Sequence, residues 1–221
     1  MGSPVDYRDW SNVNQRFSKG LDGLARFIKD QGLVPGLWLA PYGQSNEEVV
    51  KASRAFLLTP DGQSASSTWE GKFLLDPSKP ETLSYLNQLF TKLSAVWGFE
   101  YFKIDGQPIV VDEYRQRQEF MASPGDPEQL YRRTLETIRQ AIGPNRFLLG
   151  CWGTPLEGAG IFNGSRTGGD IVPAWEGFQV AVEATMKYYF LHNIVWYCDP
   201  DVMLVRYPLT QDMARAWASL Q

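Results

Sequence analysis

The chain has 221 residues, of which 43% are hydrophobic and 21% are charged, and a chain of this kind can bury one sizeable core. Its formal net charge of −4 gives no electrostatic reason to bind nucleic acid or an anionic membrane. No apolar run approaches the roughly 18–20 residues that a membrane span needs, and no basic-then-apolar leader opens the sequence. We therefore expect no nucleic-acid or membrane partner.

Metal-ligating residues are scarce in this sequence. The only histidine is His192 and the only cysteines are Cys151 and Cys198, too few for a multi-histidine or four-cysteine metal site. His192 ends an apolar periodic segment, where a histidine usually lies near helix-end carbonyl groups. If the protein is an enzyme, carboxylates are the candidates for its acid, base or nucleophile, so we expect it to need no metal or organic cofactor.

The N-terminal half is expected to alternate helices and strands, from the periodicity of its apolar residues. The expected elements are, in chain order, a helix over 21–28 that Gly32 can end, a strand at 34–40, a short strand near 73–75, a helix over 83–97 and a strand at 101–104. Residues 41–72 form a long polar stretch, for which a functional loop and a floppy insertion remain equally open.

The C-terminal half continues the alternation. Its best-signalled helix has Asp126 as N-cap, Pro127 at its first position and Gly143 after its end. The other expected elements are an apolar strand at 147–149, a short strand near 166–167, a helix over about 175–192, a strand at 194–197 and a last amphipathic segment over 209–220.

This alternation predicts an α/β fold with a parallel sheet and helices outside it. No G-x-G-x-x-G loop follows the first strand, which weakens a nucleotide-binding open sheet. Polar loops that follow the strands are typical of a TIM-type (β/α)8 barrel, but such a barrel usually needs about 250 residues. We therefore interpret residues 1–221 as one catalytic barrel domain that is truncated at one or both ends.

Two aspartates are the candidate catalytic residues. Asp105 ends an apolar strand, and Lys103 points to the same side of that strand, so a cation would keep the carboxylate ionised, as a nucleophile requires. Asp170 follows a glycine-rich turn after Arg166 and could be a general acid, which must hold its proton at neutral pH. For each aspartate, and for Asp201 after the next strand, an ordinary turn residue is the alternative.

Four segments together resemble the ordered motifs of melibiase-type α-galactosidases, more closely glycoside hydrolase family 36 than its relative, family 27. The segments are GLWLAP at 36–41, YFKID at 101–105, RTGGD at 166–170 and DPD at 199–201. The resemblance covers nearly the whole chain, from about Phe17 to Arg206. It implies a retaining glycosidase that acts through two displacements.

The resemblance also implies a role for individual residues. Asp105 matches the nucleophile at the end of the fourth barrel strand, and Asp170 matches the acid/base at the end of the sixth. The residues that match substrate-binding positions are Trp38 as an aromatic wall, Lys103 and Arg166 as sugar-hydroxyl ligands, Cys151 and Trp152 where the C2 substituent is sensed, and Asp201 as a further pocket carboxylate. The expected partner is an α-galactoside oligosaccharide or glycoconjugate.

The sequence also departs from the family pattern. The family's first strand carries paired aspartates, whereas Asp6 and Asp9 resemble the loop after that strand, and the eighth strand is absent as well. An unclosed barrel exposes the edges of strands 34–40 and 194–197, so we expect homo-oligomers or aggregates. The alternatives are an α-N-acetylgalactosaminidase, an α-galactosyl transferase, or a non-catalytic carbohydrate-binding fragment.

Overall fold

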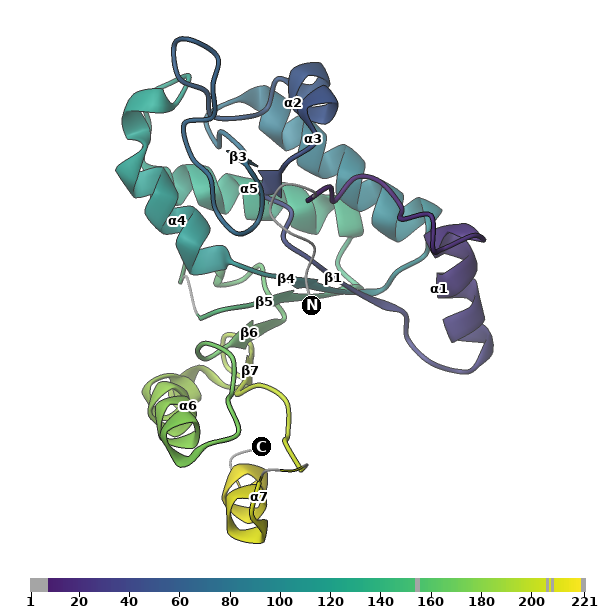
Figure 1. Ribbon diagram of the computed structural model, residues 1–221, viewed down its shortest axis with the longest axis vertical. Helices are drawn as coiled ribbons and strands as arrows, with labels where there is room; N and C mark the ends of the chain where they lie inside the picture. Colours follow the sequence, from purple (N-terminus) through teal and green to yellow (C-terminus); the bar gives the residue numbers. More distant parts are fainter. Residues whose placement is uncertain (1–7, 154–155, 206, 208, 220–221) are drawn as a thin grey trace.

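The computed structural model describes residues 8–153, 156–205, 207 and 209–219. Its centre is a parallel five-stranded sheet in the order β1-β4-β5-β6-β7 (Figure 1). The strands are β1 (Gly36–Leu39), β4 (Tyr101–Ile104), β5 (Phe147–Gly150), β6 (Gly164–Arg166) and β7 (Tyr197–Asp199). Within the described part of the chain, β1 and β7 are the two edges of an open sheet.

Helices separate most of the strands along the chain. They are α1 (Gly20–Asp30), α2 (Glu47–Ser53), α3 (Pro80–Thr91), α4 (Gln107–Gln116), α5 (Pro127–Ile142), α6 (Trp175–Tyr188) and α7 (Gln211–Ala218). Figure 1 shows α3, α4 and α5 together on one side of the sheet, with α6 and α7 beyond β7. No helix among the described residues has the length and apolar character needed to cross a bilayer.

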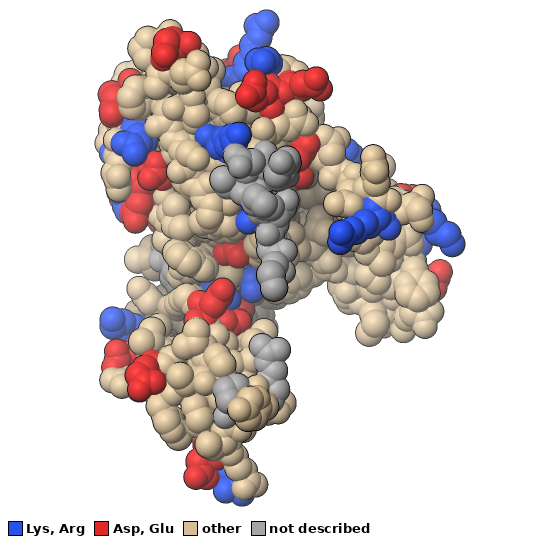
Figure 2. Space-filling model, viewed as in Figure 1, with Lys and Arg blue, Asp and Glu red and all other residues tan. Residues whose placement is uncertain are grey.

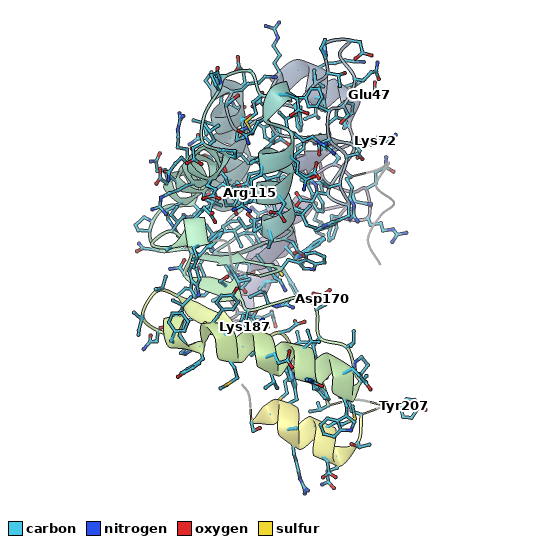
Figure 3. All side chains as sticks on the ribbon, turned by 90° about the vertical axis from the view of Figure 1, so that its left-hand side faces the viewer. Glu47, Lys72, Arg115, Asp170, Lys187 and Tyr207 are labelled. Carbon is cyan, nitrogen blue, oxygen red and sulfur yellow. The ribbon has the colours of Figure 1, made fainter. Side chains whose placement is uncertain are left out.

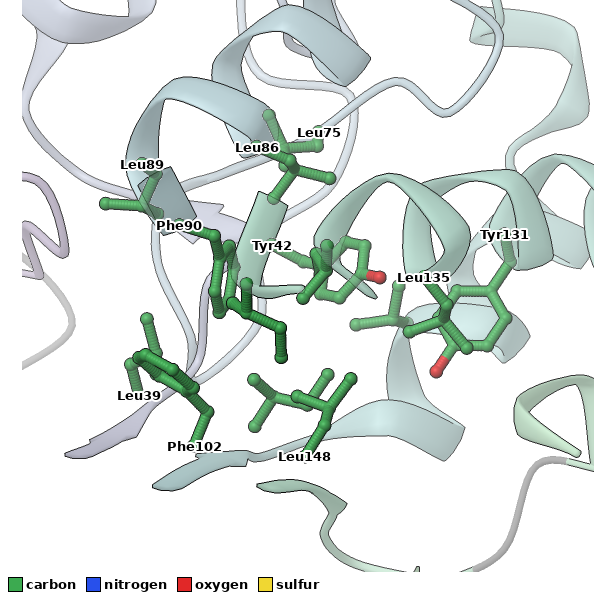
Figure 4. Packing of buried hydrophobic residues seen from close by; sticks show 14 of the residues in the cluster. Leu39, Tyr42, Leu75, Leu86, Leu89, Phe90, Phe102, Tyr131, Leu135 and Leu148 are labelled. Atoms are coloured by element: carbon green, nitrogen blue, oxygen red, sulfur yellow. The ribbon is translucent and has the colours of Figure 1, made fainter. Parts of the chain in front are cut away.

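The main core lies between the sheet and the helices α3 and α5 (Figure 4). Phe102 and Ile104 of β4 are fully buried, and the ring of Phe102 meets that of Phe90 from α3 edge to face at 5.7 Å. Leu148 of β5 and Leu135 of α5 complete this layer. Because side chains alternate along a strand, burying Phe102 and Ile104 turns Lys103 and Asp105 toward the opposite face of the sheet.

The opposite face carries a row of aromatic rings near the amino ends of the strands. Tyr101 of β4 stacks on Phe147 of β5 with ring centroids 5.2 Å apart, and Phe147 stacks on Tyr197 of β7 at 6.5 Å. Gly164 of β6 lies between them in the sheet, and a Cβ atom there would touch the Phe147 ring. The aromatic rings therefore cover the amino ends of these strands, and polar side chains lie at their carboxyl ends.

The helix expected from Asp126 to Gly143 is confirmed as α5. The Asp126 carboxylate accepts the amide N–H groups of Glu128 at 2.9 Å and Gln129 at 3.4 Å, and Gly143 ends the helix. We expect Asp126→Ala to lower the free energy of unfolding by about 1 kcal/mol, because two amides lose their acceptor. Asp126→Asn should cost much less, and chemical denaturation of the two variants measures the difference.

The interpretation of residues 73–75 as a strand of the main sheet is wrong. Phe73–Leu74 forms β3, which pairs antiparallel with β2 (Gly43–Gln44) in a separate small sheet. Glycine makes the close approach of the neighbouring segments feasible, because a Cβ atom on Gly71 would collide with the backbone of Gln44.

Two further expectations need correction. Residues 41–72 are not one polar loop, since they contain β2 and the helix α2, whose N-cap Asn46 accepts the amide of Glu48 at 3.1 Å. The last strand begins at Tyr197 rather than at residue 194. Residues 191–196 form a turn instead, in which the amide of Ile194 donates to the carbonyl of Leu191 and the Ile194 side chain is 82% exposed.

Candidate active site

Asp105 follows β4 and is held from three directions. Its Oδ2 accepts a hydrogen bond from Trp38 Nε1 at 2.8 Å, and its Oδ1 accepts one from the amide of Gly106 at 2.8 Å. Its carbonyl accepts from Gln107 Nε2 at 2.8 Å, and the buried Gln107 in turn accepts from the Tyr131 hydroxyl at 2.6 Å. These hydrogen bonds fix the orientation of the Asp105 carboxylate and of the turn that follows it.

Three tryptophans form a wall beside Asp105. Trp38, at the carboxyl end of β1, stacks on Trp69 at 6.3 Å and meets Trp10 edge to face at 5.5 Å. The Arg8 guanidinium lies over the rings of both Trp10 and Trp69. Trp38 could be identified from its motif at a strand end, whereas Trp10 and Trp69 could not, because neither belongs to a recognisable strand end.

Cys151 follows β5 and connects the two halves of the site. It is buried, its amide donates to the carbonyl of Ile104 at 2.8 Å, and its Sγ lies 3.5 Å from Arg166 Nη1. Burial raises the pKa of the Cys151 thiol to about 12, the nearby Asp105 carboxylate adds to the rise, and Arg166 and Lys103 oppose it. Lys103 and Asp105 therefore both lie close to this thiol.

We expect Cys151 to be modified by iodoacetamide much more slowly than Cys198 at mildly alkaline pH. The reactive species is the thiolate, and Cys151 combines burial with a pKa near 12, whereas Cys198 is only half-buried with a smaller rise of its pKa. Peptide mass spectrometry of the native protein measures both rates. In denaturant the two rates should converge, and rapid native labelling of Cys151 would contradict the burial described here.

Arg166 joins the loops that follow β6 and β7. It is 1% exposed, and its Nη2 lies 2.9 Å from Asp201 Oδ2, 2.6 Å from the carbonyl of Gly169 and 3.4 Å from Asp170 Oδ1. Asp201 Oδ2 also accepts the amide of Ile171 at 2.8 Å. The closer partner of Arg166 is thus Asp201, which leaves Asp170 more loosely held.

Asp170 projects from the protein. Its side chain is 75% exposed, and Figure 3 shows it between the layer that holds Arg115 and the helix α6 that carries Lys187. Trp152, after Cys151, has a left-handed backbone with φ of 84° and a half-exposed ring. An exposed carboxyl and an exposed indole are both accessible to a ligand.

The remaining sequence candidates have other surroundings. Asp6 lies outside the described residues. Asp9 lies in an irregular segment and accepts from the side chains of Ser11, Asn12 and Asn46. Burial alone would raise the pKa of Asp9, but these hydrogen bonds outweigh it and lower the pKa to about 2. His192 follows the short helix that ends at Leu191, where its amide donates to the carbonyl of Tyr189 at 2.9 Å, and its Nδ1 accepts the amide of Cys198.

Neither a metal cluster nor a one-signed surface marks this site. Among the described residues, no group of three or more His, Cys, Asp or Glu side chains is arranged to hold a metal ion. Acidic and basic side chains are interspersed on the face seen in Figure 2. The chemistry available at the carboxyl ends of the strands is therefore that of carboxylates, a buried guanidinium, an ammonium group and indoles.

Comparison with known proteins assigns the family. The model of the family described as Melibiase matches residues 5–136, which is more than half of the chain. The chain belongs to the melibiase family. The matched region contains Trp38 and Asp105, and Asp170 lies beyond it.

Solved structures extend the similarity over the rest of the chain. An α-galactosidase from Thermus thermophilus in complex with stachyose is 26% identical with a TM-score of 0.74, covering 94% of this chain and 48% of that one. A family 27 β-L-arabinopyranosidase from Geobacillus stearothermophilus is 19% identical with a TM-score of 0.62, covering 93% and 50%. A cycloalternan-degrading enzyme from Trueperella pyogenes is 15% identical with a TM-score of 0.62, covering 91% and 31%.

These similarities confirm the expected α/β class and a TIM-type barrel fold, of which this chain forms an open part. The chain spans about half the length of the first of these structures.

Proposed function

We propose that this chain carries the catalytic residues of a retaining glycoside hydrolase that cleaves terminal α-linked galactose. One observation carries the proposal: Asp105 and Asp170 follow β4 and β6 of one parallel sheet, and Arg166 and Cys151 connect them. The carboxyl ends of parallel strands are where this type of barrel places its chemistry. Membership of the melibiase family and similarity to an α-galactosidase support the same reaction.

In the proposed first step, Asp105 attacks the anomeric carbon while the bond to the leaving oxygen breaks. Asp170 gives its proton to that oxygen, so a glycosyl-aspartate and a free alcohol result. In the second step water attacks the same carbon, the ester bond to Asp105 breaks, and the proton of the water passes to Asp170. We expect the two carboxyl groups to approach roughly 5–5.5 Å in the working complex, as retention requires.

The substrate-binding roles follow from the surroundings of the two carboxyl groups. Trp38 supplies an indole face, and Lys103 supplies an ammonium group on the same side of β4 as Asp105. Beyond Cys151, Trp152 adds a second accessible ring. Arg166 and Asp201 are buried and paired with each other, so we propose that they shape the sugar site as a unit.

Hydrolysis of nitrophenyl α-galactoside by the full chain tests this proposal. We expect release of nitrophenol, with nuclear magnetic resonance showing the α anomer of galactose as the first product. Faster hydrolysis of the α-N-acetylgalactosaminide or of the β-L-arabinopyranoside would change the substrate, and sugar transfer to an added acceptor would indicate a transferase. A first product of β configuration would contradict the retaining mechanism.

A non-catalytic carbohydrate-binding fragment is the second candidate. Two features favour it. The sheet of the described residues is open at β1 and β7, and Trp38 Nε1 donates a hydrogen bond to one carboxylate oxygen of Asp105. Calorimetry with galactose beside the hydrolysis assay separates the two candidates, because binding without turnover supports only this second one.

A further inference from the structure

Glu70 is a fully buried carboxyl group that the proposed reaction does not use. It lies just before β3, where the chain packs against β2, and its exposed fraction is 0%. Its carbonyl accepts from Trp10 Nε1 at 3.1 Å, and a Cβ atom on Gly43 would collide with its backbone. The position of Glu70 is therefore fixed by the tryptophan wall on one side and by β2 on the other.

The carboxyl group of Glu70 is directed at the turn that carries Asp105. A Cβ atom on Gly106 would collide with Glu70 Oε1 and would also press on the Trp69 ring. Gly106 has φ of 79°, a conformation that glycine adopts without strain. Glycine at 106 therefore allows the turn after β4 to close directly over the Glu70 carboxyl.

No described group makes a hydrogen bond of good geometry to either oxygen of Glu70. Burial raises the pKa of Glu70 well above its ordinary value, and repulsion by the Asp105 carboxylate raises it further. The amide groups of Gly43 and Tyr42 lie near enough to favour the charged form, but their effect is smaller. A buried carboxyl beside a second carboxylate keeps its proton unless a cation compensates.

Among the described residues, three buried phenols respond to the charge of Glu70, and they do not supply that compensation. Tyr42 after β1, Tyr114 on α4 and Tyr131 on α5 are fully buried, and the charge of Glu70 would raise the pKa of each of them. The Arg8 guanidinium packs on tryptophan rings. In the described part of the chain, the groups that affect the pKa of Glu70 or respond to its charge are thus a carboxylate, phenols and backbone amides, and none of them is a cation.

We propose that Glu70 is a positioning residue that remains a neutral carboxylic acid beneath the Asp105–Gly106 turn, so that Asp105 keeps its negative charge without a second carboxylate beside it. The catalytic consequence rests on the proposed function, whereas the protonation of Glu70 does not. An ionised Glu70 would repel Asp105 and leave a buried charge at the base of the site.

Infrared spectroscopy of the full chain tests the protonation directly. At neutral pH, where exposed carboxyl groups are ionised, we expect a carbonyl-stretch band of a protonated carboxyl that is absent from Glu70→Gln. A spectrum without this band, or a band that Glu70→Gln retains, would overturn the proposal. Because this measurement needs no turnover, an inactive protein with the band would reject the proposed function and keep the role of Glu70.

The Asp105→Asn variant tests whether the charge of Asp105 affects the protonation of Glu70. If the role of Glu70 were purely structural, this variant would not change the pH at which Glu70 ionises. With Asp105 neutral, Glu70 loses the repulsion, so its band should disappear at lower pH than in the unchanged protein. If the Glu70 band disappeared at the same pH in both proteins, the proposed electrostatic coupling between Glu70 and Asp105 would be wrong. This variant also keeps the proposal testable if Glu70→Gln does not fold.

Stability against pH gives an independent check. A raised pKa in the folded state means that the folded protein holds a proton which the unfolded chain releases. The equilibrium constant for unfolding should then increase about tenfold for each pH unit above the ordinary glutamate pKa, so the folded protein becomes less stable. The increase should stop once Glu70 ionises in the folded state. Glu70→Gln should lack this contribution. Equal pH profiles for the two proteins would contradict the proposal.

Discussion

Replacing Asp105 with alanine is expected to reduce the hydrolysis of nitrophenyl α-galactoside by about 10⁴-fold or more. The variant has no carboxylate to form the glycosyl-enzyme, and the oxygen that Trp38 Nε1 contacts at 2.8 Å is lost as well. Steady-state kinetics with purified protein measures the effect.

Azide distinguishes the roles of the two aspartates. In Asp105→Ala, azide should attack the sugar directly from the vacated face and give the inverted β-galactosyl azide. In Asp170→Ala, substrates with good leaving groups should still glycosylate Asp105, and azide should then give the α product. If both variants yielded the same anomer, the assignment of nucleophile and acid/base would be wrong.

Asp112 offers a matched control for these variants. It lies on α4, seven residues after Asp105, and its exposed carboxylate pairs with Arg115 at 2.8 Å on the helix surface. Asp112→Ala should retain activity close to that of the unchanged protein. Loss of activity in Asp112→Ala, with activity kept in Asp105→Ala, would identify a different nucleophile.

Replacing Arg166 with alanine is expected to lower the free energy of unfolding by about 3–5 kcal/mol, because removing one partner of a buried ion pair is strongly destabilising. The Arg166 guanidinium is 1% exposed and lies 2.9 Å from the buried carboxylate of Asp201. It also holds the carbonyl of Gly169, so its loss frees the loop after β6. Chemical denaturation followed by circular dichroism measures the change.

Arg115 is the matched control for Arg166. It pairs with three carboxylates, those of Asp112, Glu128 and Glu157, but its side chain is 46% exposed. An exposed ion pair contributes about 0–1 kcal/mol, so Arg115→Ala should cost far less. Adding Asp201→Asn to Arg166→Ala should recover part of the loss, since the carboxylate that faced Arg166 is then removed. Equal destabilisation by the two alanine variants would contradict the buried pair.

The strands and helices with strong local signals could be predicted from the sequence. The run at 101–104 and the cap at Asp126 were sufficient for β4 and α5, because a buried parallel strand is continuously apolar and a capped helix has fixed end chemistry. The helices α2 and α4 were missed. Each has few buried apolar side chains, and only Asp105 and Gly106 separate α4 from the strand β4 before it.

The parts of the site that depend on distant segments could not be predicted. Asp105, Arg166 and Asp170 belong to motifs at strand ends, where position along the chain indicates position in the fold. Glu70 and Trp69 lie in a stretch without regular periodicity, and only the pairing of β2 with β3 brings them against Gly106. The one signal available was an apolar and acidic pair beside a glycine inside an otherwise polar segment.

The way the Asp105–Gly106 turn is held also affects how the protein ages in storage. Aspartyl-glycyl bonds isomerise when the glycine nitrogen attacks the side-chain carboxyl carbon, which requires a freely rotating backbone. Here the Gly106 amide donates a hydrogen bond to Asp105 Oδ1, and the Gln107 side chain donates one to the Asp105 carbonyl. Both contacts restrict rotation of this backbone. The pair Asp61–Gly62 is also hydrogen-bonded, to Thr59, but it lies in an exposed turn. Isoaspartate should therefore accumulate first at residue 61, as peptide mapping of stored protein would detect, and the carboxylate at residue 105 should keep its chemical identity longer.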